Sequence, residues 1–178
     1  MSEFKIVNQV NDTIIKEMIE LDKLVFKGED IGSFQKCKEW VKSNPDIYTV
    51  LMQDDKVIGY INFMPITENA YQAIKQGKLK DYELHSNHIV KFKKDVPMRC
   101  LFTSIVIHTD HQTGLELVRL WKGFLNKLKS LNLTISSVIM DCVSYLGEKC
   151  AKNYLGAQFI TNSHNGKIYE GNIKELKL

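Results

Sequence analysis

The sequence predicts an α/β (α+β) chain built on a mixed, twisted sheet with flanking helices, in one domain over residues 1–178. Strand-like and helix-like segments alternate along it. Residues 98–107, MRCLFTSIVI, form a near-continuous apolar run, which is typical of a strand at the centre of a sheet. Short turns at Asp54–Asp55 and at residues 164–166 each join two β-rich runs. Such antiparallel hairpins argue against a doubly wound nucleotide-binding fold.

The beginning of the chain reads as a strand followed by two helices. Residues 4–10, FKIVNQV, are β-rich, and Asn11 or Asp12 then offers an N-cap. A helix from there to about residue 26, and a second helix capped by Ser33, carry apolar residues at helical spacing. These are Ile14, Met18, Leu21 and Val25 in the first helix, and Phe34, Cys37, Trp40 and Val41 in the second. The sequence SNPD at residues 43–46 ends the second helix.

The middle of the chain continues with a hairpin and a short helix. Two β-rich runs flank Asp54–Asp55, and Pro65 ends the second run. Thr67 caps a short helix whose apolar face carries Ala70, Tyr71 and Ile74. Residues 77–97 are polar and basic, and their pattern favours neither a helix nor a strand.

The second half of the chain repeats a strand–helix order twice and then ends in a hairpin. After the central strand, the most regular helix of the sequence carries Leu117, Trp121, Phe124, Leu128 and Leu131 on one face. A strand over residues 134–144 leads into a helix over residues 145–155. The last two strands, residues 157–163 and 166–173, flank the turn HNG.

Composition places the chain in the soluble globular class. Hydrophobic residues make up 44% and charged residues 25%, and no apolar run approaches the roughly 18 residues of a membrane helix. The N-terminus, MSEFKIVNQV, lacks the apolar segment of a signal peptide, so we expect a cytoplasmic location. The net charge is +3, and the densest basic cluster, Lys91–Asp95, reads as a solvated loop. We therefore expect neither a nucleic acid nor a membrane as a partner.

The cysteines and histidines favour no metal site. The four cysteines form no C-x-x-C pair, so reduced thiols are expected. The five histidines form no zinc-binding pattern, and His108 and His111 have only Asp110 beside them.

The segment Ile107–Val118, IHTDHQTGLELV, joins the central strand to the most regular helix. The first N–H groups of a helix have no partner within the helix, and its dipole adds positive character there. A diphosphate can occupy such a site, and a glycine lets it approach the backbone closely. The same segment also reads as an ordinary helix N-terminus capped by Asp110 or Thr113.

The element order and this segment resemble the GNAT superfamily of N-acetyltransferases over nearly the whole chain. The family segment V-x-P-x-x-[RQ]-x-x-G-x-[GA] aligns without a gap on Val106, His108, His111, Gly114 and Glu116. Histidines replace the proline and the basic or amide residue, and Glu116 replaces a small residue. The runs DDKVIGYINFMPI and KCAKNYLGAQFI resemble the central hairpin of the family and the end of its last helix.

The resemblance implies that acetyl-CoA is the cofactor. Backbone amides of Gln112–Leu117 would bind the diphosphate, and His111 would donate to it when protonated. Amides near Ser104–Ile107 would polarise the thioester carbonyl. We expect the Glu116 side chain to point away from the diphosphate. The implied cofactor-binding residues are Ile105, Val106, Ile107, His111, Gln112, Thr113, Gly114, Leu115, Glu116 and Leu117.

The resemblance also implies catalytic candidates on the helix before Gly156, namely Tyr154, Tyr145 and Ser144. Counting back from Gly156 puts Lys152 at the tyrosine position of the family, whereas taking Phe159 as the family aromatic puts Tyr154 there. Tyr154 then either protonates the thiolate or packs the helix. Ser144, beside Tyr145, either contacts the pantetheine or caps the helix.

The general base is left open between a chain of waters and a carboxylate. The carboxylate candidates are Glu29, Asp30 and Asp141. The acceptor site, between the first two helices and the terminal hairpin, would be lined by Phe34, Trp40 and Tyr169, for which core packing is an equal reading.

Two functions follow from this resemblance. The first is an acetyl-CoA-dependent N-acetyltransferase that moves an acetyl group to a primary amine of a small molecule or a peptide. The second is a catalytically inactive GNAT-like acyl-CoA-binding or regulatory domain, which Glu116 and the two tyrosine registers favour. A homodimer is left open.

Overall fold

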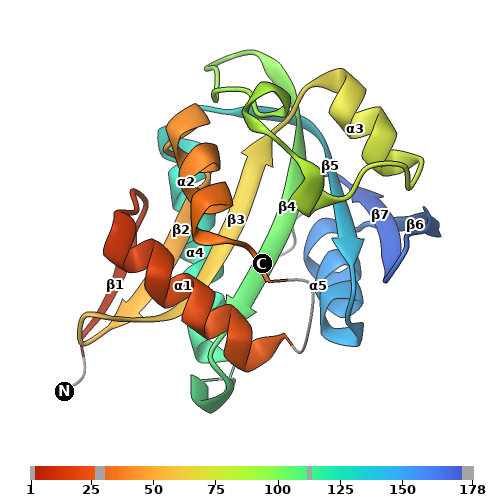
Figure 1. Cartoon of the computed structure of the whole chain (residues 1–178). Coiled ribbons are helices and arrows are strands. Elements are labelled where there is room, and N and C mark those ends of the chain that lie inside the picture. Colours follow the sequence, from red (N-terminus) through yellow and green to blue (C-terminus); the bar gives the residue numbers. More distant parts are fainter. Residues whose placement is uncertain (1–2, 27–30, 112–113, 174–178) are drawn as a thin grey trace. The chain divides into compact units, whose positions relative to one another are not determined.

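The computed structural model describes residues 3–26, 31–111 and 114–173. Seven strands form one mixed sheet in the order β1-β2-β3-β4-β5-β7-β6 (Figure 1). The strands are β1 (Phe4–Val7), β2 (Tyr48–Gln53), β3 (Lys56–Pro65), β4 (Pro97–Ile107), β5 (Thr134–Cys142), β6 (Gln158–Asn162) and β7 (Lys167–Gly171). The helices are α1 (Asp12–Val25), α2 (Phe34–Ser43), α3 (Glu68–Lys75), α4 (Leu115–Ser130) and α5 (Tyr145–Leu155). The predicted mixed sheet with flanking helices is therefore confirmed.

Local capping explains where the helices begin. The side chain of Asn11 accepts a hydrogen bond from the amide of Ile14, and Ser33 and Thr67 cap α2 and α3 in the same way. Strand β1 ends at Val7 rather than at residue 10, because the chain bends before the Asn11 cap. The chain packs as two compact units, and the expectation of one domain over residues 1–178 stays a prediction.

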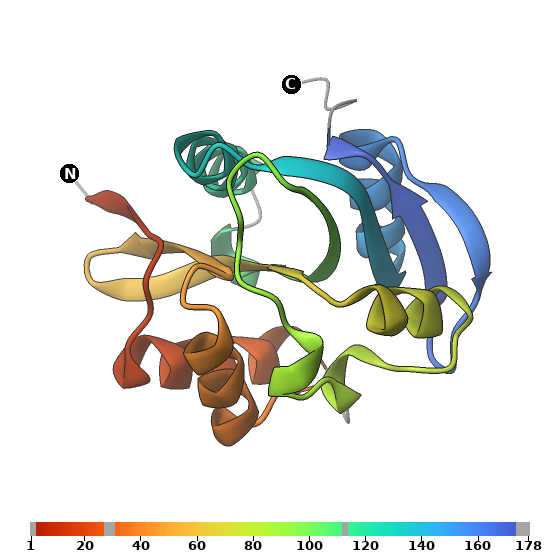
Figure 2. The ribbon, with the colours of Figure 1, turned by 90° about the horizontal axis from the view of Figure 1, so that it is seen from above.

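Unit 1 comprises Met1–Asn62 and Ser104–Asn132. Its strands β1 and β2 are antiparallel, as are β2 and β3. Asp54 and Asp55 both have positive φ angles, 47° and 63°, which is the backbone that a tight two-residue hairpin requires. Helices α1 and α2 lie on one face of this part of the sheet and α4 lies on the other (Figure 2).

The α4 face of unit 1 is closely packed. A Cβ on Gly123 of α4 would lie 2.7 Å from the Cδ1 atom of Ile6 on β1, so a larger residue there would have to displace the Ile6 side chain. Trp121, Phe124 and Leu128 of the predicted stripe are buried, whereas Leu117 and Leu131 are half-buried, and Leu120 is buried as well. Packing on β1 and β2 therefore fixes the position of α4, the helix that follows the candidate cofactor-binding segment.

Unit 2 comprises Phe63–Thr103 and Leu133–Leu178. Strand β4 pairs in parallel with β5, from Pro97 opposite Thr134 to Leu101 opposite Ile139, and β5 pairs antiparallel with β7. The segment over residues 77–97 that the sequence left unassigned contains two short 3-10 helices, η1 (Asp81–Glu83) and η2 (Ser86–His88). An isolated bridge between Ile66 and Ile89 holds this segment to the end of β3.

Candidate functional site

The C-terminal end of β4 lies against β3 at a glycine. A Cβ at Gly59 would lie 2.5 Å from the Cδ1 atom of Ile107 and 2.8 Å from the carbonyl oxygen of Val106. The amide of His108 donates to the carbonyl of Ile58 at 2.8 Å. The glycine of the predicted hairpin therefore lets the candidate cofactor strand pack closely on its neighbour.

The segment after β4 ends at Gly114, whose backbone conformation favours glycine. Gly114 occupies the N-cap position of α4 with φ 93°, in the left-handed region, and has no side chain of its own to cap the helix. Apart from its chain neighbours, no atom of the described residues lies within 4 Å of the place where a Cβ would be, so the space above Gly114 is open on that side. Gln112 and Thr113 lie outside the described residues. The N-cap residue of α4 is Gly114 rather than Asp110, whose amide donates to Nδ1 of His108 at 3.2 Å.

The first turn of α4 follows Gly114 directly. Within the described part of the chain, the amide of Val118 donates to the carbonyl of Gly114 at 3.1 Å. The amides of Leu115, Glu116 and Leu117 precede it. Leu115 is 65% exposed, so this end of the helix is accessible. The diphosphate-binding role of this turn stays a prediction.

Glu116 and the two histidines of the motif are placed in unit 1. The Glu116 side chain is buried, with 8% of its surface exposed, and an acidic residue in the first turn suits the helix dipole. Its orientation relative to a bound diphosphate stays a prediction. The rings of His108 and His111 lie 5.6 Å apart, and His111, the predicted phosphate donor, ends the short helix η3 (Thr109–His111).

Helix α5 carries the catalytic candidates of unit 2. Ser144 caps it, because its Oγ atom accepts a hydrogen bond from the amide of Gly147 at 3.0 Å. Tyr145 is 77% exposed, whereas Tyr154 is half-buried one turn or less before the left-handed Gly156 that ends the helix. Their roles toward a cofactor stay predictions.

The remaining expected site residues have structural environments. Asp141 accepts a hydrogen bond from Ser163 at 2.7 Å, and Glu29 and Asp30 lie outside the described residues. Trp40 and Tyr169 are 5% and 2% exposed, so the core-packing reading holds for both. The Tyr169 hydroxyl donates to Glu148 at 2.7 Å.

A buried polar network in unit 1 was missed by the sequence reasoning. Asp22 on α1 is only 7% exposed, and its Oδ1 atom accepts a hydrogen bond from the Tyr60 hydroxyl at 2.6 Å. Burial raises the pKa of Tyr60, and hydrogen bonding from the neighbouring Ser104 of β4 opposes that rise. Burial raises the pKa of the Asp22 carboxyl to about 6, and the hydrogen bond from Tyr60 opposes that rise.

The same face holds a second polar cluster beside Asp22. The Tyr48 hydroxyl is hydrogen-bonded to both Cys37 and Asn62. Burial raises the pKa of the Cys37 thiol, and the hydrogen bond from Tyr48 opposes the rise. The Oδ1 atom of Asn62 is buried without a hydrogen-bond donor among the described residues. This face of unit 1 is therefore rich in hydrogen-bond acceptors.

The opposite face of unit 1 holds a buried cation. Lys127 of α4 is 5% exposed, and its ammonium donates to the carbonyl oxygens of Asp46 and Tyr48 at 2.8 and 2.9 Å. Burial lowers the pKa of Lys127 to about 7, and the charge of Asp46 opposes this shift. The contacts tie the last turns of α4 to the chain that enters β2.

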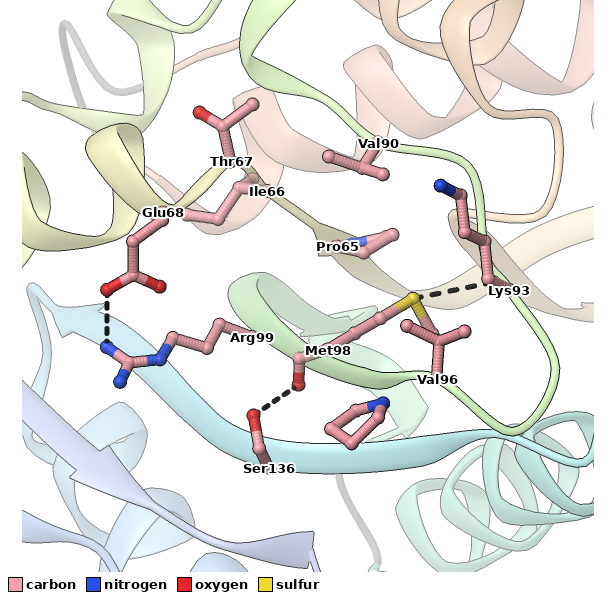
Figure 3. A pocket seen from close by; sticks show the side chains of 11 residues that line it. Pro65, Ile66, Thr67, Glu68, Val90, Lys93, Val96, Met98, Arg99 and Ser136 are labelled. Atoms are coloured by element: carbon pink, nitrogen blue, oxygen red, sulfur yellow. Dashed lines mark hydrogen bonds and ion pairs between the residues drawn. The ribbon is translucent and has the colours of Figure 1, made fainter.

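Unit 2 contains a pocket of about 320 Å³ where β3 ends and β4 begins (Figure 3). Its walls are mostly apolar, with the ion pair of Arg99 and Glu68 at 3.0 Å along one side. The Ser136 hydroxyl donates to the carbonyl of Met98 at 2.9 Å, so its hydrogen is already used. The lining residues are Pro65, Ile66, Thr67, Glu68, Val90, Lys93, Val96, Pro97, Met98, Arg99 and Ser136.

Two kinds of site are absent from the described part of the chain. Residues 3–26, 31–111 and 114–173 contain no group of three or more His, Cys, Asp or Glu that could hold a metal ion. None of the helices within these ranges combines the length and apolar character that a membrane crossing needs.

Comparison with solved structures identifies the fold. No family model matches the chain, and no curated protein matches it. It is similar to the GphF GNAT-like decarboxylase in complex with isobutyryl-CoA, at 13% identity over 95% of this chain and 99% of that one, with a TM-score of 0.65. It is similar to the loading GNATL domain of CurA from Lyngbya majuscula, at 12% identity over 97% and 98% of the two chains, with a TM-score of 0.61.

A structure with a bisubstrate analogue that contains CoA is similar to this chain as well. Naa50 from Arabidopsis thaliana, in complex with the bisubstrate analogue CoA-Ac-MVNAL, is 11% identical over 94% of this chain and 95% of that one, with a TM-score of 0.56. The chain therefore has the GNAT fold, which confirms at the level of the fold the resemblance seen in the sequence.

Proposed function

We propose that the chain binds acetyl-CoA and transfers its acetyl group to a primary amine of a small molecule or a peptide. One observation carries this proposal: β4 leads, through a left-handed Gly114 with open space above it, into the accessible N-terminus of α4. Such a terminus offers N–H donors and a favourable dipole to a diphosphate. Neighbours that share the fold are bound to isobutyryl-CoA or to an analogue containing CoA.

The proposed roles follow the order of the chain. Amides of Gln112–Leu117, with His111, would bind the diphosphate, and amides of Ile105–Ile107 would stabilise charge on the thioester oxygen. Tyr154 would protonate the leaving thiolate, and Ser144 and Tyr145 would contact the pantetheine. The cytoplasmic location and a homodimer stay predictions.

The fold alone does not choose between acyl transfer and other chemistry on an acyl-CoA. The structures similar to this chain include a GNAT-like decarboxylase as well as a GCN5-related N-acetyltransferase from Kribbella flavida. A domain that binds acyl-CoA without catalysis is the second candidate function, and the buried Glu116 at the proposed diphosphate site favours it. An assay should therefore follow CoA release and CO₂ release separately, with acetyl-CoA and with an acyl-CoA that carries a β-carboxylate.

Calorimetric titration with acetyl-CoA tests the binding step. Gly114→Ala should weaken binding about tenfold, because its methyl group would project into the open space and strain a positive φ by roughly 1–2 kcal/mol. Gly77→Ala is the matched control, since Gly77 also has a positive φ, 67°, but lies after α3 in unit 2. Equal affinities of wild type and Gly114→Ala for acetyl-CoA would show that the diphosphate does not bind at this loop.

A further inference from the structure

We propose that Asp22 is the final acceptor of the proton that the amine substrate loses, and that Ser104 and Tyr60 carry this proton to it. The inference rests on the proposed acyl transfer and adds a base, which the sequence had left open. Its basis is geometric: the Tyr60 hydroxyl of β3 donates to Asp22 of α1 at 2.6 Å, and Ser104 of β4 lies beside Tyr60 in the same unit.

The direction of the hydrogen bonds suits proton movement toward Asp22. The Tyr60 hydroxyl donates to Oδ1 of Asp22 at 2.6 Å, so its own oxygen is left to accept from Ser104. Each hydroxyl can accept a proton on one side while it donates its hydrogen on the other. The carboxylate at the end of the chain has no hydrogen to donate, so it is the natural acceptor.

Exposure explains why a relay is needed. Asp22 and Tyr60 are 7% and 4% exposed, so neither can meet a substrate directly. Ser104 is half-buried and stands immediately before Ile105–Ile107, the strand residues proposed to hold the thioester. The amine nitrogen must reach the thioester carbonyl, so it must also come close to Ser104.

The titratable side chains around the Asp22 carboxylate are neutral. The titratable groups that face Asp22 from neighbouring elements are Tyr60 of β3, Tyr48 of β2 and Cys37 of α2, which are all neutral at physiological pH. The buried Oδ1 atom of Asn62 adds another hydrogen-bond acceptor on this face. Burial raises the pKa of Asp22 to about 6, so it is ionised yet basic enough to accept a proton near neutral pH.

The proton and electron balance is complete. The ammonium loses one proton to Oγ of Ser104, the Ser104 hydrogen passes to Tyr60, and the Tyr60 hydrogen passes to Asp22. The amine lone pair then forms the C–N bond with the thioester carbon, and the C–S bond breaks. The tetrahedral nitrogen then loses its second proton, which balances the proton that Tyr154 gives to the thiolate, and the Asp22 proton returns to solvent by the same path.

The test compares an amine that is protonated at neutral pH with one that is already neutral. CoA release from acetyl-CoA is followed with a panel of alkyl amines and a short peptide with a free N-terminus, and with hydroxylamine. For Asp22→Asn we expect a loss of about 10²- to 10⁴-fold with the protonated amines and a much smaller loss with hydroxylamine. The fall in wild-type rate below a pH of about 6 should disappear in this variant.

Two further variants separate the relay from folding effects. Ser104→Ala, at the accessible end of the path, should reproduce the selective loss with protonated amines. Glu20→Gln is the matched control, because Glu20 is an exposed carboxylate of the same helix that pairs with Lys23 at 2.6 Å. Affinity for acetyl-CoA should be unchanged in all three variants.

The outcomes distinguish the relay from the proposed function. Acetyl transfer by the wild type with an equal loss for both kinds of amine in Asp22→Asn, or with no loss, would overturn the relay alone. Failure of the wild type to bind acetyl-CoA, or binding without CoA release for any amine, would overturn the proposed acyl transfer and the relay together.

Discussion

Asp22 on α1 and Lys127 on α4 are buried ionisable groups on opposite faces of the unit 1 sheet, and burial moves both pKa values toward neutrality. Their hydrogen bonds differ. Asp22 is joined through the Tyr60 hydroxyl to the half-buried Ser104, whereas Lys127 donates to two backbone carbonyl oxygens. A carbonyl oxygen accepts hydrogen bonds but has no hydrogen to pass on.

The different hydrogen-bond partners of Asp22 and Lys127 show that a shifted pKa does not by itself mark a functional group. Lys127 has the larger shift, yet its contacts end in the backbone and hold α4 to the start of β2. Asp22 has the smaller shift, but its contacts lead to the strand proposed to bind the thioester. We therefore infer a structural role for Lys127 and a chemical role for Asp22. Four experiments test these assignments and the site around them.

The largest expected effect is on turnover in Tyr154→Phe, which extends the contrast to α5. If the Tyr154 hydroxyl protonates the leaving thiolate, its removal should lower the turnover number about 10²- to 10⁴-fold while the ring still packs. Affinity for acetyl-CoA, measured by calorimetry, should hold. Tyr82→Phe, at an exposed tyrosine of η1, is the control, and an unchanged rate in Tyr154→Phe would return Tyr154 to a packing role.

Lys127→Met should change how stability depends on pH. The folded pKa of about 7 lies below the unfolded value of 10.5, so between these pH values the unfolded chain binds more protons and wild-type stability rises with pH. Relative to Lys127→Met, the wild-type free energy of unfolding should rise by roughly 4 kcal/mol from about pH 7 to about pH 10.

Urea denaturation at several pH values measures this slope. The matched control for the loss of a charge from α4 is Lys129→Met, an exposed lysine two residues further on. A difference between wild type and Lys127→Met that stays constant with pH would show that Lys127 keeps its proton in the fold, and the proposed similarity to Asp22 would fail.

Asp22→Asn should stabilise the fold while it lowers activity. The folded pKa of about 6 lies above the unfolded value of 3.8, so wild-type stability falls as pH rises through this window and the full cost is present above it. Asparagine keeps an oxygen that can accept from Tyr60 and carries no charge. Above that window we expect a gain on the order of 2 kcal/mol in the free energy of unfolding.

Thermal and urea denaturation on either side of the window check the gain. Glu20→Gln again serves as the control on the same helix, because Glu20 is exposed. A variant that is less stable than wild type at neutral pH would mean that the Asp22 charge holds the fold together, as the Lys127 contacts do.

The smallest expected effect is that of Glu116→Gln on acetyl-CoA affinity. Unit charges about 6 Å apart repel by roughly 3 kcal/mol at an effective dielectric of 20, and by much less with screening. If the side chain points away from the diphosphate, affinity measured by calorimetry should be nearly unchanged or a few-fold tighter. Much weaker binding would show instead that the buried carboxylate organises the first turn of α4.

Features that depend on neighbouring residues were predicted well from the sequence. Asn11, Ser33 and Thr67 cap their helices as expected, and Asp54–Asp55 forms the hairpin turn. Each of these depends on hydrogen bonds or backbone angles within a few residues, so the local sequence specifies them. The GNAT fold followed from the order of such elements together with one degenerate motif.

The segment between β3 and β4 was not predicted in the same way. Residues 77–97 contain two short 3-10 helices, and the bridge between Ile66 and Ile89 holds this segment to the end of β3. Turns this short carry no periodic apolar pattern, because they are too short to repeat one. Their conformation is set by what they pack against.

By itself, the sequence determined the helix caps, the hairpin turns, the apolar stripes and hence the fold class, because these act over a few residues. Only the tertiary structure decided that Asp22 meets Tyr60, 38 residues away, and that Ser104 closes the path. A carboxylate at position 22 reads as a surface charge until other elements bury it. Burial, which raises its pKa to about 6, is a property of the assembled layers and not of the residues beside it.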